Sequence, residues 1–347
     1  MRPKTATKSG TKTGTKTGPK TAGALFAFAA CVAACQVYDP SEPGNLVPKT
    51  VDEDPTIPSL ALAGTVFHFQ TYGDPTKPVI VFLHGGPGAD FREMLRLNER
   101  YDGYALTDDH FVVFWDQRGS GLSRRHDCDV YSIDQADADL DALVDHVSPG
   151  RPVTLIGHSW GGMYATLYID RHPEKVAGAV LMEPGPLNGQ LFDSISSELY
   201  DIDFFSEWLN DDAWDAQFLT PDDQARADYH RALGARDSQP KFHQATKDPA
   251  PFWRLGAVAN RCLTKSGLKD GKGAYDFTDH LSAYTQRVLF VASAWNEVIG
   301  VAFQERQRQF FPASDLVTIA DAGHDMDWVQ PAATLAAIHA YLTEVAQ

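Results

Sequence analysis

The stretch Gly157-His158-Ser159-Trp160-Gly161 decides how the rest of the sequence is interpreted. An apolar, β-branched run at 152–156 precedes it, and residues 163–169 after it have helical spacing, so the serine falls at a turn from a strand to a helix. On such a strained turn the hydroxyl stands above the sheet edge, and the two glycines let strand and helix approach closely. The sequence therefore predicts Ser159 as a nucleophile, the alternative being a serine that only caps the helix.

The first 35 residues predict a secretory signal peptide. Six lysines and arginines and no acidic residue precede an apolar run at 22–34, which ends in small residues before Cys35. Residues 32–35, Val-Ala-Ala-Cys, resemble a bacterial lipoprotein signal, in which the cysteine is acylated and becomes the new N-terminus. We therefore expect an exported protein, periplasmic or at the cell surface, whose contact with a membrane is a lipid on Cys35. Plain secretion is the alternative.

Composition limits the partners. The chain has 347 residues, 43% of them apolar, which is enough for one large domain with an insertion. The chain has 30 Lys and Arg; without the six of the leader, 24 remain against 46 Asp and Glu, so nucleic acid is not an expected partner. Beyond the leader, Cys128 and Cys262 form either a disulfide or two buried thiols. No Cys-x-x-Cys motif or His/Cys cluster suggests a metal, and no cofactor is expected.

Hydrophobic patterning predicts an α/β architecture. An alternating segment at 64–73 predicts an antiparallel strand, and mainly apolar runs predict buried strands at 78–83, 111–115, 153–156, 176–182, 288–291 and 316–319. Helices are expected between 88 and 111, at 134–147 and at 332–345, so the strands should form a parallel sheet covered on both faces. That rhythm stops at 187–280, where helical pieces at 198–209 and 221–233 predict a cap. The predicted boundaries are 1–35 signal, 36–58 linker, 59–186 and 281–347 core, and 187–280 cap.

Two further motifs supply the remaining chemistry. The glycines of His84-Gly-Gly-Pro-Gly88 free main-chain N–H groups, so the N–H of Gly86 and that of Trp160 are predicted to form an oxyanion hole. His324 follows the last strand within Ala-Gly-His-Asp, where the chain order serine, acid, histidine requires the base. The sequence thus predicts acyl transfer, with His324 taking and returning the proton.

The motifs HGGPG, DQRGSG and GHSWGG, together with the terminal AGH, resemble those of the α/β-hydrolase superfamily, most closely its proline iminopeptidase-like branch. The resemblance covers residues 64–184 and 287–345. It implies a mostly parallel eight-stranded sheet with helices on both faces and an inserted helical cap. It also implies a serine hydrolase that cleaves an amide or ester bond of a short peptide or small molecule through an acyl-enzyme. The alternatives are a carboxylesterase-type hydrolase and a non-catalytic binding module.

The acid is the open member of the triad. The branch places an Asp after its seventh strand, whereas this sequence has Asn296 there. The two candidate carboxylates are Glu183, at the end of the strand next to the nucleophile strand, and Glu297. Position favours Glu183, and the run 176–183 resembles the same strand in a group of haloalkane dehalogenases whose catalytic glutamate follows a Met. In the alternative reading, Glu183 caps the following turn or binds a substrate amine.

Overall fold

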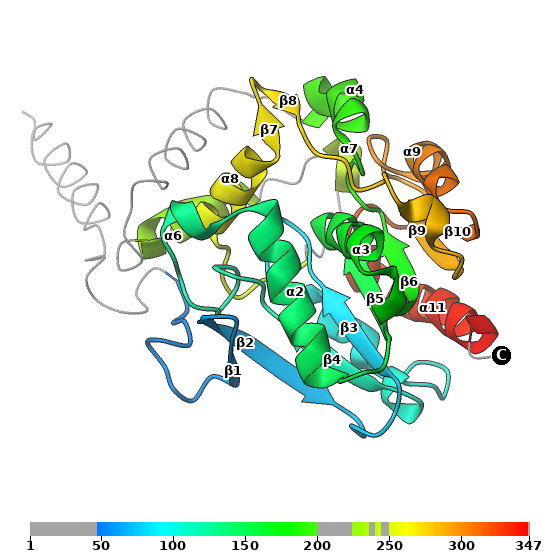
Figure 1. The fold of residues 1–347 in the computed structure, drawn as a ribbon, viewed down its shortest axis with the longest axis horizontal. Coiled ribbons are helices and arrows are strands. Elements are labelled where there is room, and N and C mark those ends of the chain that lie inside the picture. Colours follow the sequence, from blue (N-terminus) through cyan, green and yellow to red (C-terminus); the bar gives the residue numbers. More distant parts are fainter. Residues whose placement is uncertain (1–46, 200–223, 236–239, 244–249, 346–347) are drawn as a thin grey trace, which may run out of the picture. The chain divides into compact units, whose positions relative to one another are not determined.

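The computed structural model describes residues 47–199, 224–235, 240–243 and 250–345, so the predicted signal peptide and residues 36–46 lie outside it. Its centre is an eight-stranded sheet (Figure 1) with the order β1-β2-β4-β3-β5-β6-β9-β10. The strands are β1 Ser59–Leu62, β2 Thr65–Tyr72, β3 Val79–Leu83, β4 Phe111–Trp115, β5 Val153–His158, β6 Val176–Met182, β9 Val288–Ser293 and β10 Ser314–Ile319. β1 and β2 are antiparallel to their neighbours and the other pairs are parallel, which confirms the predicted architecture.

Helices cover both faces of the sheet because successive residues of a strand point to opposite sides. In β3, Val79, Val81 and Leu83 pack in one core cluster, whereas Ile80 and Phe82 pack in the other. The first cluster includes α2 Ile133–Val147 and α3 Trp160–Arg171, which Figure 1 shows on the near side of the sheet. The second includes the short 3-10 helix η1 Glu93–Asn98, α10 Met326–Val329 and α11 Pro331–Val345.

The fold departs from the sequence prediction in three places. β1 was not predicted, and the helix expected between 88 and 111 is only the short η1. The linker predicted for 36–58 is wrong in its second part, because Val47 and Thr50 are buried and the Val51 N–H donates to the Leu122 carbonyl (2.9 Å). Residues 47–51 are therefore fastened to the domain, whereas most of the side chains of 52–58 are exposed.

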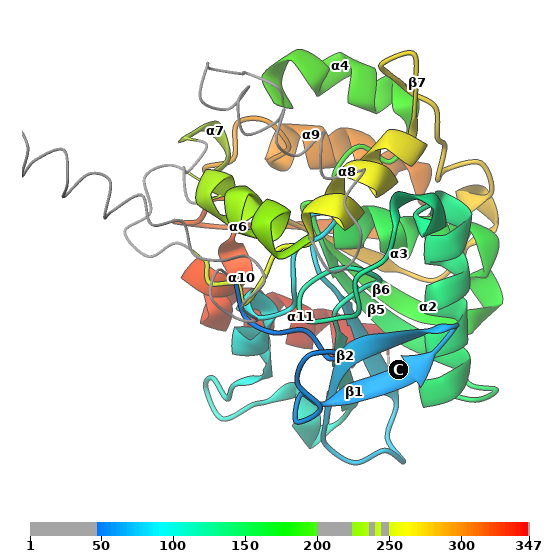
Figure 2. The ribbon, with the colours of Figure 1, turned by 90° about the vertical axis from the view of Figure 1, so that its left-hand side faces the viewer.

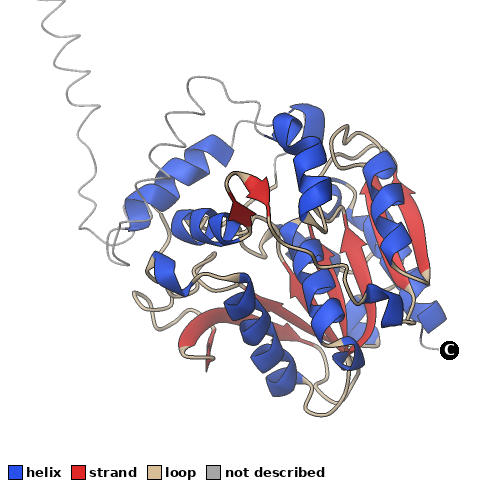
Figure 3. Cartoon of the chain, turned by 45° about the horizontal axis from the view of Figure 1, so that its top comes forward, coloured by secondary structure: helices blue, strands red, loops and turns tan. Residues whose placement is uncertain are grey.

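Between β6 and β9 lie the elements of the predicted cap, which Figure 2 shows on one side of the sheet. They are α4 Gly189–Leu199, α6 Gln224–Ala235, α7 Pro240–His243, α8 Ala257–Ser266 and the hairpin of β7 Leu268–Lys269 with β8 Lys272–Gly273, the pair of short strands apart from the central sheet in Figure 3. The helix predicted at 221–233 corresponds to α6, whereas most of the one predicted at 198–209 lies outside the described residues.

Covalent and ionic contacts fasten these elements to the core. A disulfide joins Cys128, which precedes α2, to Cys262 on α8. The buried carboxylate of Asp228 on α6 accepts hydrogen bonds from Arg125 (3.0 Å) and Arg254 (2.7 Å).

Within the described ranges no helix has the length and apolarity needed to cross a bilayer. α9 Val301–Gln307 follows β9 and completes the helices of the core.

Candidate active site

Ser159 lies between the end of β5 and the start of α3, with φ +54° and ψ −117°. A positive φ is strained for a residue with a side chain, and it is typical of a nucleophile on a sharp strand-to-helix turn. The backbone around the turn holds this conformation: the Ser159 N–H donates to the Met182 carbonyl (2.9 Å), and the Ser159 carbonyl accepts from Gly162 N–H (3.0 Å).

The flanking glycines are required by close contacts of the main chain. A Cβ on Gly157 would collide with the carbonyl of Gly161, and a Cβ on Gly161 would collide with the carbonyl of Leu83 at the end of β3. Because α3 starts this close to β3 and β5, its first N–H groups and the positive end of its dipole lie at the sheet edge beside Ser159.

The loop 84–88 runs along the other side of Ser159. A Cβ on Gly85 would lie 3.2 Å from the Cβ of Ser159, so the loop touches the serine. Gly86 has φ +116°, and a Cβ there would meet the amide nitrogens of Gly88 and Ala89 at 2.7 Å. A side chain at position 86 would therefore be strained and would clash, so glycine is required there.

A chain of hydrogen bonds holds this loop against the elbow. The Gln117 N–H donates to Nε2 of His84 (3.0 Å), and Nδ1 of His84 is 2.9 Å from the Gly85 carbonyl. The Gln117 side chain donates to the His84 carbonyl (3.0 Å) and accepts from the indole N–H of Trp160 (2.9 Å). Burial lowers the pKa of His84, which is consistent with a neutral ring that supports the loop and does not act as a base.

Glu183 lies at the end of β6 with φ +40°, and its side chain is fully buried. Its Oε2 is 2.7 Å from Nδ1 of His324 and accepts a hydrogen bond from the amide of Asn296 (2.7 Å). Its Oε1 accepts from the N–H (2.7 Å) and hydroxyl (2.6 Å) of Ser293. A carboxylate held by these donors fixes the ring of His324 through Nδ1, so Nε2 is the ring nitrogen on the other side.

The structure thus brings Glu183, and not Glu297, to the imidazole. Glu297 is exposed, and within the described ranges its carboxylate makes no hydrogen bond to His324. The sequence did not predict the roles of Ser293 and Asn296, although Asn296 stands where the resemblance implies an acid. Its amide oxygen accepts from the N–H groups of Val298 (3.0 Å) and Ile299 (3.0 Å), which orients the amide nitrogen toward Glu183.

His324 is held from two further sides. Its main-chain N–H donates to the carbonyl of Phe242 in α7 (2.9 Å), so a cap helix is bonded to the loop that carries His324. Nε2 of His158, the residue before Ser159, is 2.9 Å from the His324 carbonyl, and the two rings are 4.5 Å apart. Among the described residues no hydrogen bond joins the Ser159 hydroxyl to His324. Such contacts often tighten only when substrate binds.

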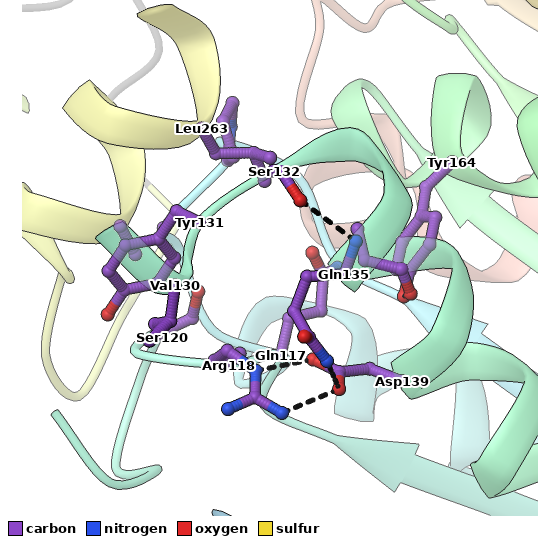
Figure 4. A pocket seen from close by; sticks show the side chains of 14 residues that line it. Gln117, Arg118, Ser120, Val130, Tyr131, Ser132, Gln135, Asp139, Tyr164 and Leu263 are labelled. Atoms are coloured by element: carbon purple, nitrogen blue, oxygen red, sulfur yellow. Dashed lines mark hydrogen bonds and ion pairs between the residues drawn. The ribbon is translucent and has the colours of Figure 1, made fainter. Parts of the chain in front are cut away.

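The cap also contacts the loop 84–88. Gly256, the residue before α8, donates its N–H to the Gly88 carbonyl (2.7 Å). On α8 itself, the side-chain amide of Asn260 donates to the Pro87 carbonyl (2.6 Å). Behind the loop is a cavity of about 20 Å³, with the Arg118–Asp139 ion pair at one end and Leu263 at the other (Figure 4). It has room for about one water, so it is not a substrate site.

Comparison with known proteins places this arrangement in a family. The model of the alpha/beta hydrolase fold matches residues 78–331. A proline iminopeptidase of Lactobacillus helveticus is 36% identical over 126 residues, which are 35% of this chain and 41% of that protein's length. A "Probable proline iminopeptidase" of Leptolyngbya boryana is 23% identical over 76% of this chain and 85% of its own.

The likeness to solved structures concerns the fold. A thermophilic esterase from Thermogutta terrifontis superposes with a TM-score of 0.61 at 20% identity, covering 83% of this chain and 97% of the esterase. The family match spans the elbow, the loop 84–88, the end of β6 and the loop of His324. The chain therefore belongs to the α/β-hydrolase fold family, in its proline iminopeptidase-like branch.

Proposed function

We propose that this protein is a serine hydrolase that cleaves an amide or ester bond through an acyl-enzyme. The observation that carries the proposal is the 2.7 Å contact between Nδ1 of His324 and the buried carboxylate of Glu183, at the same sheet edge as the strained Ser159. A histidine fixed on one nitrogen by a buried carboxylate, beside a serine on a strained elbow, is the constellation that nucleophilic acyl transfer needs.

Each step has a group to perform it. The Ser159 oxygen attacks the substrate carbonyl while His324 takes the hydroxyl proton on Nε2, and the carboxylate of Glu183 stabilises the imidazolium. The oxyanion is stabilised by the N–H groups of Gly86 and Trp160. His324 then gives the proton to the leaving amine or alcohol. Water, deprotonated by the same ring, then attacks the acyl carbon, and His324 returns the proton to the Ser159 oxygen as the ester bond breaks and the acid leaves.

The relatives favour a peptide substrate with an N-terminal proline or small residue, because the names of the matched proteins are those of proline iminopeptidases. Ester hydrolysis is the second candidate. It is favoured by Glu183, which could have bound a substrate amine, but whose two oxygens are instead occupied by His324, Asn296 and Ser293.

A paired substrate screen tests the proposal. Wild type and Ser159→Ala are assayed with prolyl and alanyl arylamides and with short-chain p-nitrophenyl esters. We expect wild type to turn over one of these classes and Ser159→Ala to lose at least about 10³-fold in kcat, as expected on removal of a triad member. Equal activity of both proteins would refute Ser159 as nucleophile, and the absence of turnover in both would favour a binding module.

A further inference from the structure

A second cluster of ionisable groups lies next to His324, whose carbonyl is 2.9 Å from Nε2 of His158. Glu93 of η1, His158 at the end of β5 and Asp327 of α10 each present one ligand atom, and these atoms all lie within 4.8 Å of one another. The side chains of Glu93 and His158 are 15% and 4% exposed, and Asp327 is fully buried. None of these three groups takes part in the proposed acyl transfer.

Asp327 is the unusual member. In the described part of the chain neither of its carboxylate oxygens has a hydrogen-bond partner, although the residue is completely buried. A buried carboxylate without a donor or a cation is strongly unfavourable. Arg96, one turn along η1 from Glu93, does not serve it, because its guanidinium lies over the ring of Trp328 (4.1 Å) and donates to the Trp328 carbonyl (2.6 Å).

The ring of His158 has the orientation of a metal ligand. Its Nε2 is 2.9 Å from the carbonyl of His324 and must carry the proton there, which leaves Nδ1 facing Glu93 at 3.2 Å. Histidines that bind metals commonly donate their other N–H to a carbonyl in this way. A distance of 3.2 Å between the two ligand atoms is close to the roughly 3.3 Å edge of a tetrahedron with bonds of 2.0–2.1 Å.

Charge also favours a cation at this place. The cluster combines one imidazole with two carboxylates, so a divalent ion bound there would balance the charge of the two carboxylates. The ion would also supply the partner that Asp327 lacks.

We propose that Glu93, His158 and Asp327 bind a divalent transition metal ion, Zn²⁺ or Mn²⁺ by the character of an imidazole and two carboxylates as ligands. The ion joins η1, the elbow strand and the helix after the base loop. Its role is to position groups: through the His158 ring it braces the main chain of His324 and does not contact the substrate.

The first test measures the metal directly and needs no activity. Full-length protein, purified without chelator and with any histidine tag removed, is analysed by elemental mass spectrometry, and the chelator-treated protein is titrated with Zn²⁺, Mn²⁺, Mg²⁺ and Co²⁺. We expect about one transition ion per chain, a visible d–d spectrum with Co²⁺, and a rise in Tm of about 5 °C or more when Zn²⁺ exceeds its Kd a hundredfold. No uptake and no change in Tm would overturn the proposal.

A pair of matched variants locates the ion. Asp327→Asn removes a proposed ligand, and Asp325→Asn removes the same charge two residues earlier, from a side chain that is partly exposed. We expect Asp327→Asn to weaken Zn²⁺ binding by at least about tenfold, because even the loss of a residue that only hydrogen-bonds to a metal ligand lowers metal affinity by about that much. Asp325→Asn should bind Zn²⁺ like wild type.

The variants also distinguish the ion from a protonated His158. If a proton is the only cation, Asp327→Asn removes an unpaired buried charge and raises the Tm of the chelator-treated protein without affecting metal uptake, and that result would overturn the proposal. Should Asp327→Asn not fold, Glu93→Gln replaces a partly exposed ligand and must show the same loss of Zn²⁺ affinity. Wild-type affinity in Glu93→Gln would equally contradict the site.

Discussion

Replacing Glu183 by Gln keeps the shape of the side chain but removes its charge and one acceptor. In the wild type, Oε2 faces the N–H groups of His324 and Asn296, and Oε1 faces the N–H and hydroxyl of Ser293. In either orientation of the Gln amide, its nitrogen faces at least one N–H donor that cannot reorient. If it faces His324, the ring must move its proton to Nε2, which is the nitrogen that has to accept the proton from Ser159.

The size of the effect follows from this tautomer change and from the lost charge. Loss of the acid partner in serine triads reduces kcat by up to about 10⁴. In some of the Glu183→Gln molecules the Gln amide nitrogen can face Ser293, whose hydroxyl can rotate to accept a hydrogen bond. The loss in kcat should therefore be smaller than this limit. We therefore expect kcat to fall between about 10² and 10⁴-fold, or about 2.7–5.4 kcal/mol in activation free energy.

The assay is steady-state kinetics of Glu183→Gln on the substrate selected by the screen, with circular dichroism and Tm to show that the variant is folded. Glu297→Gln is the matched control, because that side chain is exposed and makes no hydrogen bond to His324 among the described residues, and we expect it to lose less than about tenfold in kcat. Activity of Glu183→Gln within tenfold of wild type would refute the assignment. The reverse pattern in the two variants would give the role to Glu297.

Three further predictions concern parts of the chain outside the triad. The disulfide should leave Cys128 and Cys262 unmodified when the unreduced, denatured protein is alkylated, and Cys262→Ser should lower the free energy of unfolding by about 2–5 kcal/mol in urea. Burial, followed by the charges of neighbouring arginines, lowers the pKa of His126 to about 4. Between about pH 6.5 and 4, His126 therefore binds a proton in the unfolded chain but not in the folded one, so Tm should fall as the pH drops through this range. His126→Gln should show a smaller fall in Tm. We also propose that the chain is exported and acylated on Cys35, so Cys35→Ala should release it from membranes; a wild type that stays in the soluble fraction without lipid would contradict this proposal.

The sheet could be predicted from the sequence because its central strands are continuous apolar runs. The predicted strands at 111–115 and 176–182 coincide with β4 and β6, whose residues are almost all buried. β1 was missed because it has four residues that are half-buried at most, a pattern that does not differ from that of a loop. The register between neighbouring strands determines which strand-end residues meet in the site. This register cannot be read from the hydrophobic pattern of a single sequence.

The site was predictable where one motif fixes a backbone. The elbow and the glycine loop depend on local turns, so Ser159 and Gly86 stand where their motifs place them. Residues that act through distant contacts gave no such signal. Asn296 lacks a charge and was set aside, and Glu93 and His158 are 65 residues apart in sequence, so neither suggested a shared cluster.

The most direct test of the account is covalent labelling of the purified protein with a fluorophosphonate, followed by peptide mass spectrometry. A fluorophosphonate reacts with a serine only when that serine is activated. The labelled residue therefore identifies the nucleophile even though the substrate is unknown. We predict one adduct per chain, located on Ser159, that is lost in Ser159→Ala and strongly slowed in His324→Ala. An unlabelled wild type, or an adduct on another residue, would contradict the central claim.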